Sequence, residues 1–173
     1  MSGQTLRARA ERVLDLYRAR GLRLATAESC TGGLVAAALT AIAGSSDVFD
    51  CSFVSYSNEA KEKLLGVPSA TLRRYGAVSS ETAAAMATGA LKRSRADCAV
   101  SVTGIAGPSG GSKDKPVGLV HFAAARRGGI ILARRRMFGN IGRRRVRELS
   151  ALEALALLAR LAPRTKPGSR RKA

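Results

Sequence analysis

The chain has 173 residues, of which 46% are hydrophobic and 24% are charged. This length and composition predict one soluble globular domain, with a core built mainly from Ala, Leu and Val because aromatic residues make up only 4%. The three cysteines are widely spaced and His121 is the only histidine, which excludes a disulfide framework and a zinc site of the usual spacing. No apolar run is long enough for a membrane span, and residues 1–12 are too polar for a secretory signal. We therefore expect a cytoplasmic protein that does not insert into a membrane.

The net charge of +18 is concentrated in the second half of the chain. From Arg126 onwards, 15 Lys or Arg residues face only Glu148 and Glu153. Such a charge is compatible with nucleic-acid or membrane-surface binding, but also with a site for an anionic substrate together with a solvated tail. We favour the second interpretation, because the basic half has few aromatic residues and no recognisable nucleic-acid module. Residues 163–173 are expected to form a basic tail without ordered structure.

Hydrophobic periodicity and turn residues divide the chain into alternating helices and strands. Helices are predicted over residues 4–20, 31–42, 58–66, 69–75, 79–94 and 143–161, and strands over 22–27, 49–57, 98–103, 117–125 and 130–138. The last two strands flank Gly128-Gly129 and predict an antiparallel hairpin. This order predicts an α/β fold, a three-layer α/β/α sandwich with a mixed, mostly parallel sheet and a C-terminal antiparallel hairpin, in a single domain over residues 1–162.

The segment from Ala25 to Gly33 lies between the first predicted strand and the second predicted helix. It contains an acid, two hydroxyls, a thiol and two glycines, which is typical of a turn that exposes a nucleophile beside the positive end of a helix. The alternative is that Ser29 or Thr31 only caps the helix and the glycines only allow it to pack. The segment alone does not decide between the two.

A chain with one histidine favours a hydroxyl nucleophile that is activated by a lysine. Lys61 lies one turn into the helix that follows the second strand, whereas Lys63 points to another side of that helix; the alternative is that both are solvated. The glycine-rich segment 104–116 could cradle an anion or form a flexible surface loop, and it does not match a Walker motif. Arg143 and Arg147, one turn apart, could clamp an anion.

Five motifs together resemble the CinA C-terminal domain family. They are TAESCTGG (26–33), VSYSNEAK (54–61), GAVS (76–79), SVTGIAGP (101–108) and PVGLV (116–120), in the order of the family. The resemblance covers roughly residues 5 to 160, and as a set these motifs are highly specific although each alone is weak. Two positions depart from the family pattern, since Gly142 replaces an acid before Arg143 and Thr103 replaces a frequent serine.

The resemblance implies hydrolysis of the carboxamide of nicotinamide mononucleotide to nicotinate mononucleotide and ammonia, with neither a metal ion nor a cofactor. It also implies a Ser–Lys dyad that maps onto Ser29 as nucleophile and Lys61 as base. We add Tyr56 as a catalytic candidate that could orient Lys61. The expected substrate-binding residues are Glu28, Cys30, Thr31, Gly32, Gly33, Thr103, Gly104, Arg143 and Arg147, with Glu28 also able to orient the site.

Two alternatives to this mechanism remain open. The first places the nucleophile at Cys30. The second is a non-catalytic nucleic-acid-binding or competence- and DNA-damage-related regulatory module, with nonspecific binding of nucleic acid through the basic tail. We also expect a homo-oligomer, because an interface could complete such a site.

Overall fold

The computed structural model describes residues 5–163, so the predicted basic tail lies outside the described residues except for Pro163. The helices are α1 (Leu6–Arg18), α2 (Leu34–Thr40), α3 (Asn58–Leu65), α4 (Ser69–Tyr75), α5 (Ser80–Lys92) and α6 (Arg143–Leu161). The strands are β1 (Leu24–Glu28), β2 (Phe49–Val54), β3 (Cys98–Gly104), β4 (Leu119–Arg126) and β5 (Ile130–Met137). A short 3-10 helix over Ser45–Asp47 was not predicted from the sequence.

The strands form one mixed sheet in the order β2-β1-β3-β4-β5. Strand β1 pairs in parallel with β2 and with β3, whereas β3 and β4 pair antiparallel, as do β4 and β5. Consequently β4 is the one strand of this sheet that runs against the others. The predicted α/β fold with a C-terminal antiparallel hairpin is confirmed.

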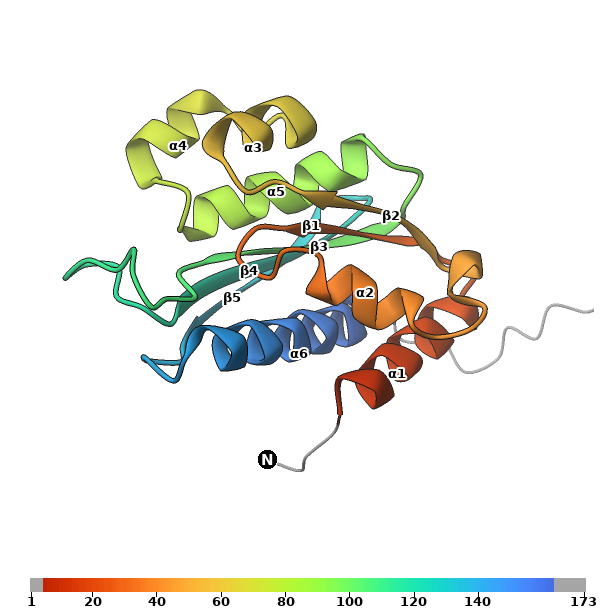
Figure 1. Cartoon of the computed structure of the whole chain (residues 1–173). Helices are drawn as coiled ribbons and strands as arrows, with labels where there is room; N and C mark the ends of the chain where they lie inside the picture. The colour runs from red at the N-terminus through yellow and green to blue at the C-terminus, as the bar shows by residue number, and fades with distance from the viewer. Residues whose placement is uncertain (1–4, 164–173) are drawn as a thin grey trace, which may run out of the picture.

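Helices cover both faces of the sheet, with α1, α2 and α6 on one side and α3, α4 and α5 on the other (Figure 1). Successive side chains of each strand point to opposite faces of the sheet and so pack against different layers of helices. Large side chains such as Val100, Val102 and Phe122 pack towards α1 and α6, while alanines such as Ala99 and Ala123 pack towards α5. Because alanine occupies little space, α5 approaches the sheet closely, which explains how a chain with few aromatic residues fills its core.

Several element boundaries differ from the prediction by a few residues, and two of these differences have a clear local chemical reason. Helix α3 begins at residue 58 as predicted and is capped by Ser57, whose hydroxyl accepts the amide of Ala60 at 3.0 Å. Strand β2 accordingly stops at Val54 instead of continuing to residue 57. Helix α2 begins at Leu34, three residues later than predicted, because the two glycines before it adopt positive φ angles.

The part of the chain that the structure describes contains no helix with the length and hydropathy needed to cross a membrane. Over the same residues, no group of three or more His, Cys, Asp or Glu side chains is arranged to hold a metal ion.

Candidate active site

The carboxyl ends of β1, β2 and β3 meet at one edge of the sheet. Glu28, the last residue of β1, is in register with Val54 of β2 and Val102 of β3. Beyond these ends, the amide of Ser29 donates to the carbonyl of Val102 at 2.9 Å, and the amide of Ser55 donates to the carbonyl of Glu28 at 2.9 Å. The residues that follow the three strands are therefore held side by side, at the edge where α/β sheets usually carry their sites.

Lys61 and Ser29 are in direct contact at this edge. The amine nitrogen Nζ of Lys61 lies 3.1 Å from Ser29 Oγ, 2.9 Å from the carbonyl oxygen of Ser55 and 3.4 Å from that of Tyr56. Lys61 is only 1% exposed and shares the buried face of α3 with Leu65, whereas Lys63 is exposed. Of the two lysines considered from the sequence, only Lys61 contacts Ser29.

The surroundings of Lys61 suit a general base. Burial disfavours its charged form and lowers the pKa of its amine. A neutral amine has two N–H bonds, and the carbonyls of Ser55 and Tyr56 are placed to accept them. The nitrogen lone pair is then left for the hydroxyl proton of Ser29.

Glu28 fixes the start of α2 from within the protein. Its side chain is fully buried, and its carboxylate oxygens accept the amides of Gly33, Val35 and Ala36 at 2.9–3.1 Å. A carboxylate at this position satisfies amides that the helix leaves free and interacts favourably with the helix dipole. The prediction that Glu28 binds substrate is therefore corrected, since the carboxylate is engaged with α2.

The alternative that Ser29 or Thr31 caps α2 is wrong. The N-cap residue is Gly33, which has no side chain to offer, and the Thr31 hydroxyl is buried without a hydrogen-bond partner among the described residues. Gly32 and Gly33 adopt φ angles of 59° and 93°, a region that favours glycine. These glycines shape the turn that presents Ser29.

Arg147 supports the same turn from α6. Its guanidinium donates to the carbonyl of Thr31 at 2.7 Å and lies against Gly32. Thr31, Gly32, Gly33 and Arg147 do not line the cavity at Ser29. In this structure they shape and support the turn that carries Ser29, and their role in substrate binding stays a prediction.

The cavity at Ser29 has a volume of about 250 Å³. It brings together seven of the predicted site residues, namely Ser29, Cys30, Tyr56, Lys61, Thr103, Gly104 and Arg143. Sequence reasoning did not single out the other residues of its wall, which are Ala77, Val78, Ile105, Ala106, Gly107, Ser109 and Gly110. The sequence indicated them only as parts of longer segments, namely the GAVS motif and the long loop after β3.

Arg143 connects the glycine-rich loop to Tyr56 across the mouth of the cavity. One of its nitrogens donates to the carbonyl of Gly107 at 2.9 Å, and another donates to the Tyr56 hydroxyl at 2.8 Å. Arg143 is thus oriented without the acid that Gly142 replaces. The expectation that the Tyr56 side chain orients Lys61 is corrected, since only its backbone carbonyl contacts Lys61 while its phenol contacts Arg143.

The end of β3 forms the floor of the site. Thr103 is buried and its hydroxyl donates to the carbonyl of Ala77 at 2.7 Å, which fixes the segment that carries Val78. A Cβ at Gly104 would lie 2.7 Å from the carbonyl oxygen of Leu119, so glycine is needed where β4 approaches. Backbone groups of residues two apart in a strand point to the same neighbour, so those of Gly104 point to the same side of β3 as those of Val102. The carbonyl of Val102 accepts the amide of Ser29 on that side. The amide of Gly104 is consequently directed past the end of β1.

Cys30 is poorly suited to act as the nucleophile. It lines the cavity but is only 5% exposed, and burial raises the pKa of its thiol to about 12. A thiol in such a site carries almost no thiolate near neutral pH, and the thiolate is the reactive form. The geometry favours Ser29 over its neighbour.

Comparisons with known proteins identify the family of the chain. The chain matches the CinA C-terminal domain family model over residues 6–162. It is 52% identical over 138 residues to the nicotinamide-nucleotide amidohydrolase PncC of Escherichia coli, which covers 80% of this chain and 84% of that protein. A crystal structure of the competence/damage inducible protein CihA from Agrobacterium tumefaciens superposes with a TM-score of 0.91 at 50% identity, covering 94% of this chain and 99% of that one.

Other relatives are much longer. The chain is 50% identical over 148 residues to a putative competence-damage inducible protein of Caldicellulosiruptor bescii, which covers 86% of this chain but 36% of that protein. The chain therefore spans about a third of the length of such relatives, while it spans most of the amidohydrolase. Since the family model covers nearly all of residues 5–163, the chain belongs to the CinA C-terminal domain family.

Proposed function

We propose that the protein hydrolyses the carboxamide of nicotinamide mononucleotide to nicotinate mononucleotide and ammonia. The observation that carries this proposal is the contact of 3.1 Å between Lys61 Nζ and Ser29 Oγ in a partly polar cavity that opens to solvent. The name and the 52% identity of the Escherichia coli amidohydrolase supply the substrate. The amide bond and the phosphate of this substrate match a cavity with a lysine-activated hydroxyl and an arginine at its mouth.

The first half of the reaction forms an acyl-enzyme. Neutral Lys61 takes the proton of Ser29, whose oxygen attacks the carboxamide carbon and converts its carbonyl into a tetrahedral oxyanion. Protonated Lys61 then returns this proton to the amide nitrogen, and ammonia leaves as the C–N bond breaks. The acyl group of the nucleotide remains attached to Ser29 Oγ as an ester.

The second half releases the product. Neutral Lys61 takes a proton from a water molecule, and the resulting hydroxide attacks the ester carbon. When the C–O bond to Ser29 breaks, Lys61 returns the proton to Ser29 Oγ and nicotinate mononucleotide departs. The dyad is then ready for another cycle.

Backbone amides are the best-placed donors for the oxyanion. No hydrogen bond described for residues 5–163 uses the amide of Cys30, which directly follows the nucleophile. We assign this amide, together with the amide of Gly104, to the oxyanion, because preorganised N–H groups stabilise such charge strongly. Arg143 and the glycine-rich loop at residues 107–110 are assigned to the phosphate.

Release of ammonia from nicotinamide mononucleotide tests this function. We expect the wild-type protein to release ammonia and nicotinate mononucleotide in equal amounts, and Ser29→Ala and Lys61→Met each to lower kcat by at least about 1,000-fold. Lys63→Met is the matched control, since it removes an exposed lysine from the same helix. Absence of turnover by the wild type, or full activity of both dyad variants, would contradict the proposal.

The remaining expectations from the sequence stay predictions. The structure contains one chain, and the basic tail lies outside the described residues. Nonspecific binding of nucleic acid through that tail would be recognised by a steep salt dependence that disappears when residues 164–173 are deleted. The homo-oligomer and the cytoplasmic location are likewise retained as proposals.

A further inference from the structure

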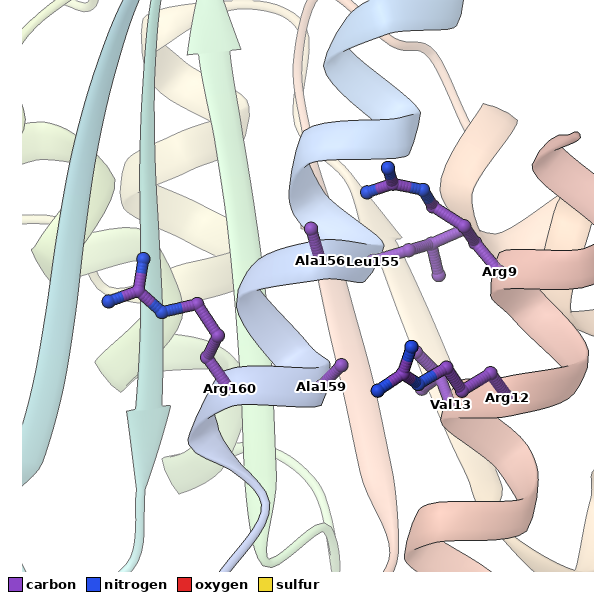
Figure 2. A pocket seen from close by; sticks show the side chains of 7 residues that line it. All are labelled: Arg9, Arg12, Val13, Leu155, Ala156, Ala159 and Arg160. Carbon is purple, nitrogen blue, oxygen red and sulfur yellow. The ribbon is translucent and has the colours of Figure 1, made fainter. Parts of the chain in front are cut away.

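A second hollow lies between α1 and α6, on the face of the sheet opposite α5. Its volume of about 260 Å³ is similar to that of the cavity at Ser29, and the two share no residue. Its apolar floor is made by Val13, Leu155, Ala156 and Ala159 (Figure 2). Val13 and Leu155 are buried where the helices pack, and the small side chains of the two alanines leave the space above them open.

Three arginines surround this floor. Arg9 and Arg12 are directed from α1 towards α6, while Arg160 lies on the other flank of α6 (Figure 2). Within residues 5–163 no carboxylate lies within salt-bridge distance of any of the three. Four other arginines of these helices do have such partners, which are Glu11 for Arg7, Asp15 for Arg18, and Glu148 for Arg144 and Arg145. Arg143 and Arg147 of α6 have none among the described residues, but both donate to carbonyls near Ser29.

Arg9 is held over the hollow with part of its guanidinium unsatisfied. One of its terminal nitrogens donates to the carbonyl of Leu152 at 3.4 Å, which draws the side chain towards α6. Its Nε is buried and has no hydrogen-bond partner among the described residues. A buried donor without an acceptor is unfavourable. Because this Nε is buried, an anion in the hollow would contact the terminal nitrogens of Arg9 instead.

We propose that this hollow binds a small organic anion, a carboxylate or phosphate joined to an apolar ring or short apolar chain. Clustered like charges without counterions create a positive potential that attracts anions. The apolar floor adds affinity for the rest of such a molecule by releasing water. Arg9 and Arg12 beside an apolar surface, in a hollow that is open to solvent, match both parts of the ligand.

The chain itself does not supply a suitable occupant. Residues 164–173 contain five Lys or Arg and no acidic side chain, and residues 1–4 contain no acidic side chain. A second copy also carries a net charge of +18, so it offers no net negative charge to the arginines of this hollow. These charges favour a separate small anion over either terminus or a homo-oligomer contact.

Calorimetric titration with phenyl phosphate tests the proposal, with inorganic phosphate and phenol as probes of the two halves. We expect phenyl phosphate to bind at least about tenfold more tightly than either half alone. Arg9→Gln combined with Arg12→Gln should weaken it at least about tenfold, because two charge-assisted contacts are lost. The matched control combines Arg144→Gln with Arg145→Gln, which removes the same charge from exposed positions and should leave the affinity within about twofold.

Ala159→Leu provides a second variant that keeps every charge and fills the hollow. It should abolish the advantage of phenyl phosphate over inorganic phosphate. Phenyl phosphate binding that is unaffected by the Arg9 and Arg12 substitutions overturns the proposal, since it would then occur elsewhere, including at Ser29. Failure of phenyl phosphate to bind, together with arginine-dependent sedimentation on phosphatidylglycerol vesicles, also overturns it in favour of a lipid surface.

Discussion

The amine of Lys61 lies 3.1 Å from the hydroxyl of Ser29, although 31 residues separate them in the chain. The contact exists because β1 and β2 end in register and the cap at Ser57 turns the chain at once into α3. Lys61, in the helix that follows β2, therefore reaches Ser29, the residue that follows β1. The lysine is buried by this packing, and its chemistry follows from that burial.

The rate of deamidation should therefore rise with pH until Lys61 is neutral. Burial lowers the pKa of Lys61, so its neutral fraction grows with pH and reaches its maximum below the pH at which an ordinary lysine, with a pKa of about 10.4, loses its proton. We expect kcat/KM to increase about tenfold per pH unit and then to level off. A profile that falls as pH rises from 6 to 9 would exclude Lys61 as the base.

Cys30 should be dispensable and slow to react. Because burial raises the pKa of its thiol to about 12, iodoacetamide at pH 7.5 should modify Cys30 far more slowly than a free thiol. Cys30→Ala should keep kcat within about fivefold of the wild type, since the amide that we assign to the oxyanion belongs to the backbone. Activity that disappears in step with alkylation of Cys30, and also in the alanine variant, would point to the thiol as nucleophile.

Glu28→Gln should weaken both the fold and the turn that holds Ser29. The carboxylate accepts three amides at the start of α2, and a neutral amide can replace neither the charge nor the second oxygen. We expect the free energy of unfolding in urea to fall by about 2–3 kcal/mol. We also expect kcat to fall more than KM rises, because Ser29 directly follows Glu28.

The matched control for Glu28→Gln is Glu81→Gln. Glu81 is an exposed carboxylate in the first turn of α5, where the side chain of Ser79 already caps the helix. Its substitution should leave the unfolding midpoint almost unchanged. Equal effects of the two substitutions would show that Glu28 acts only through its charge and not through its buried contacts.

The sequence predicted the elements and the proximity of Ser29 and Lys61 better than it predicted the contacts that support the site. The bounds of α6 and α4 agree with the predicted ranges, because Pro163 and Gly76 mark their ends and the apolar stripe of α6 is regular. The fold class followed from the alternation of helices and strands. The pairing of Ser29 with Lys61 came from the family resemblance, whereas the residues alone left both side chains open to an ordinary structural role.

The supports were missed because most of them use backbone carbonyls. Arg143 binds the carbonyl of Gly107, Arg147 binds that of Thr31, and Lys61 binds that of Ser55. Every residue has a carbonyl, so no side-chain pattern marks these partners in a sequence. The capping role of Glu28 was also missed. A capping residue normally lies next to its helix, whereas five residues separate Glu28 from the start of α2.

Gly89→Ala should displace the helix that carries Lys61. A Cβ at Gly89 of α5 would overlap the carbonyl oxygen of Leu65, one turn after Lys61 in α3. Alanine gains about 1 kcal/mol in helix propensity, but overpacking against a backbone costs typically 1–3 kcal/mol or more. We expect a lower free energy of unfolding and a kcat reduced about tenfold, since a misplacement of 1 Å is sufficient.

Thr88→Ala is the control for Gly89→Ala, because it raises helix propensity at the preceding position of α5 without adding an atom. Its kcat should match the wild type. If Gly89→Ala instead stabilises the protein and leaves kcat unchanged, the close approach of α5 and α3 does not position Lys61.

Arg143→Gln should impair recognition of the phosphate and leave the chemical step nearly intact. Loss of the guanidinium removes a charge-assisted contact, so kcat/KM for nicotinamide mononucleotide should fall about 10–100-fold, mainly through KM. Nicotinamide riboside, which lacks the phosphate, should be affected much less. Arg145→Gln, which removes a largely exposed arginine two residues away, is the control and should leave both substrates unchanged.

Tyr56→Phe distinguishes the two possible roles of Tyr56. Its phenol contacts Arg143 at 2.8 Å and only its carbonyl contacts Lys61, so losing the hydroxyl should raise KM about three- to tenfold. The pH at which kcat/KM levels off should stay that of the wild type, because the amine of Lys61 keeps both carbonyl partners. A shift of that pH in Tyr56→Phe, with KM unchanged, would instead place the phenol in the proton transfer between Lys61 and Ser29.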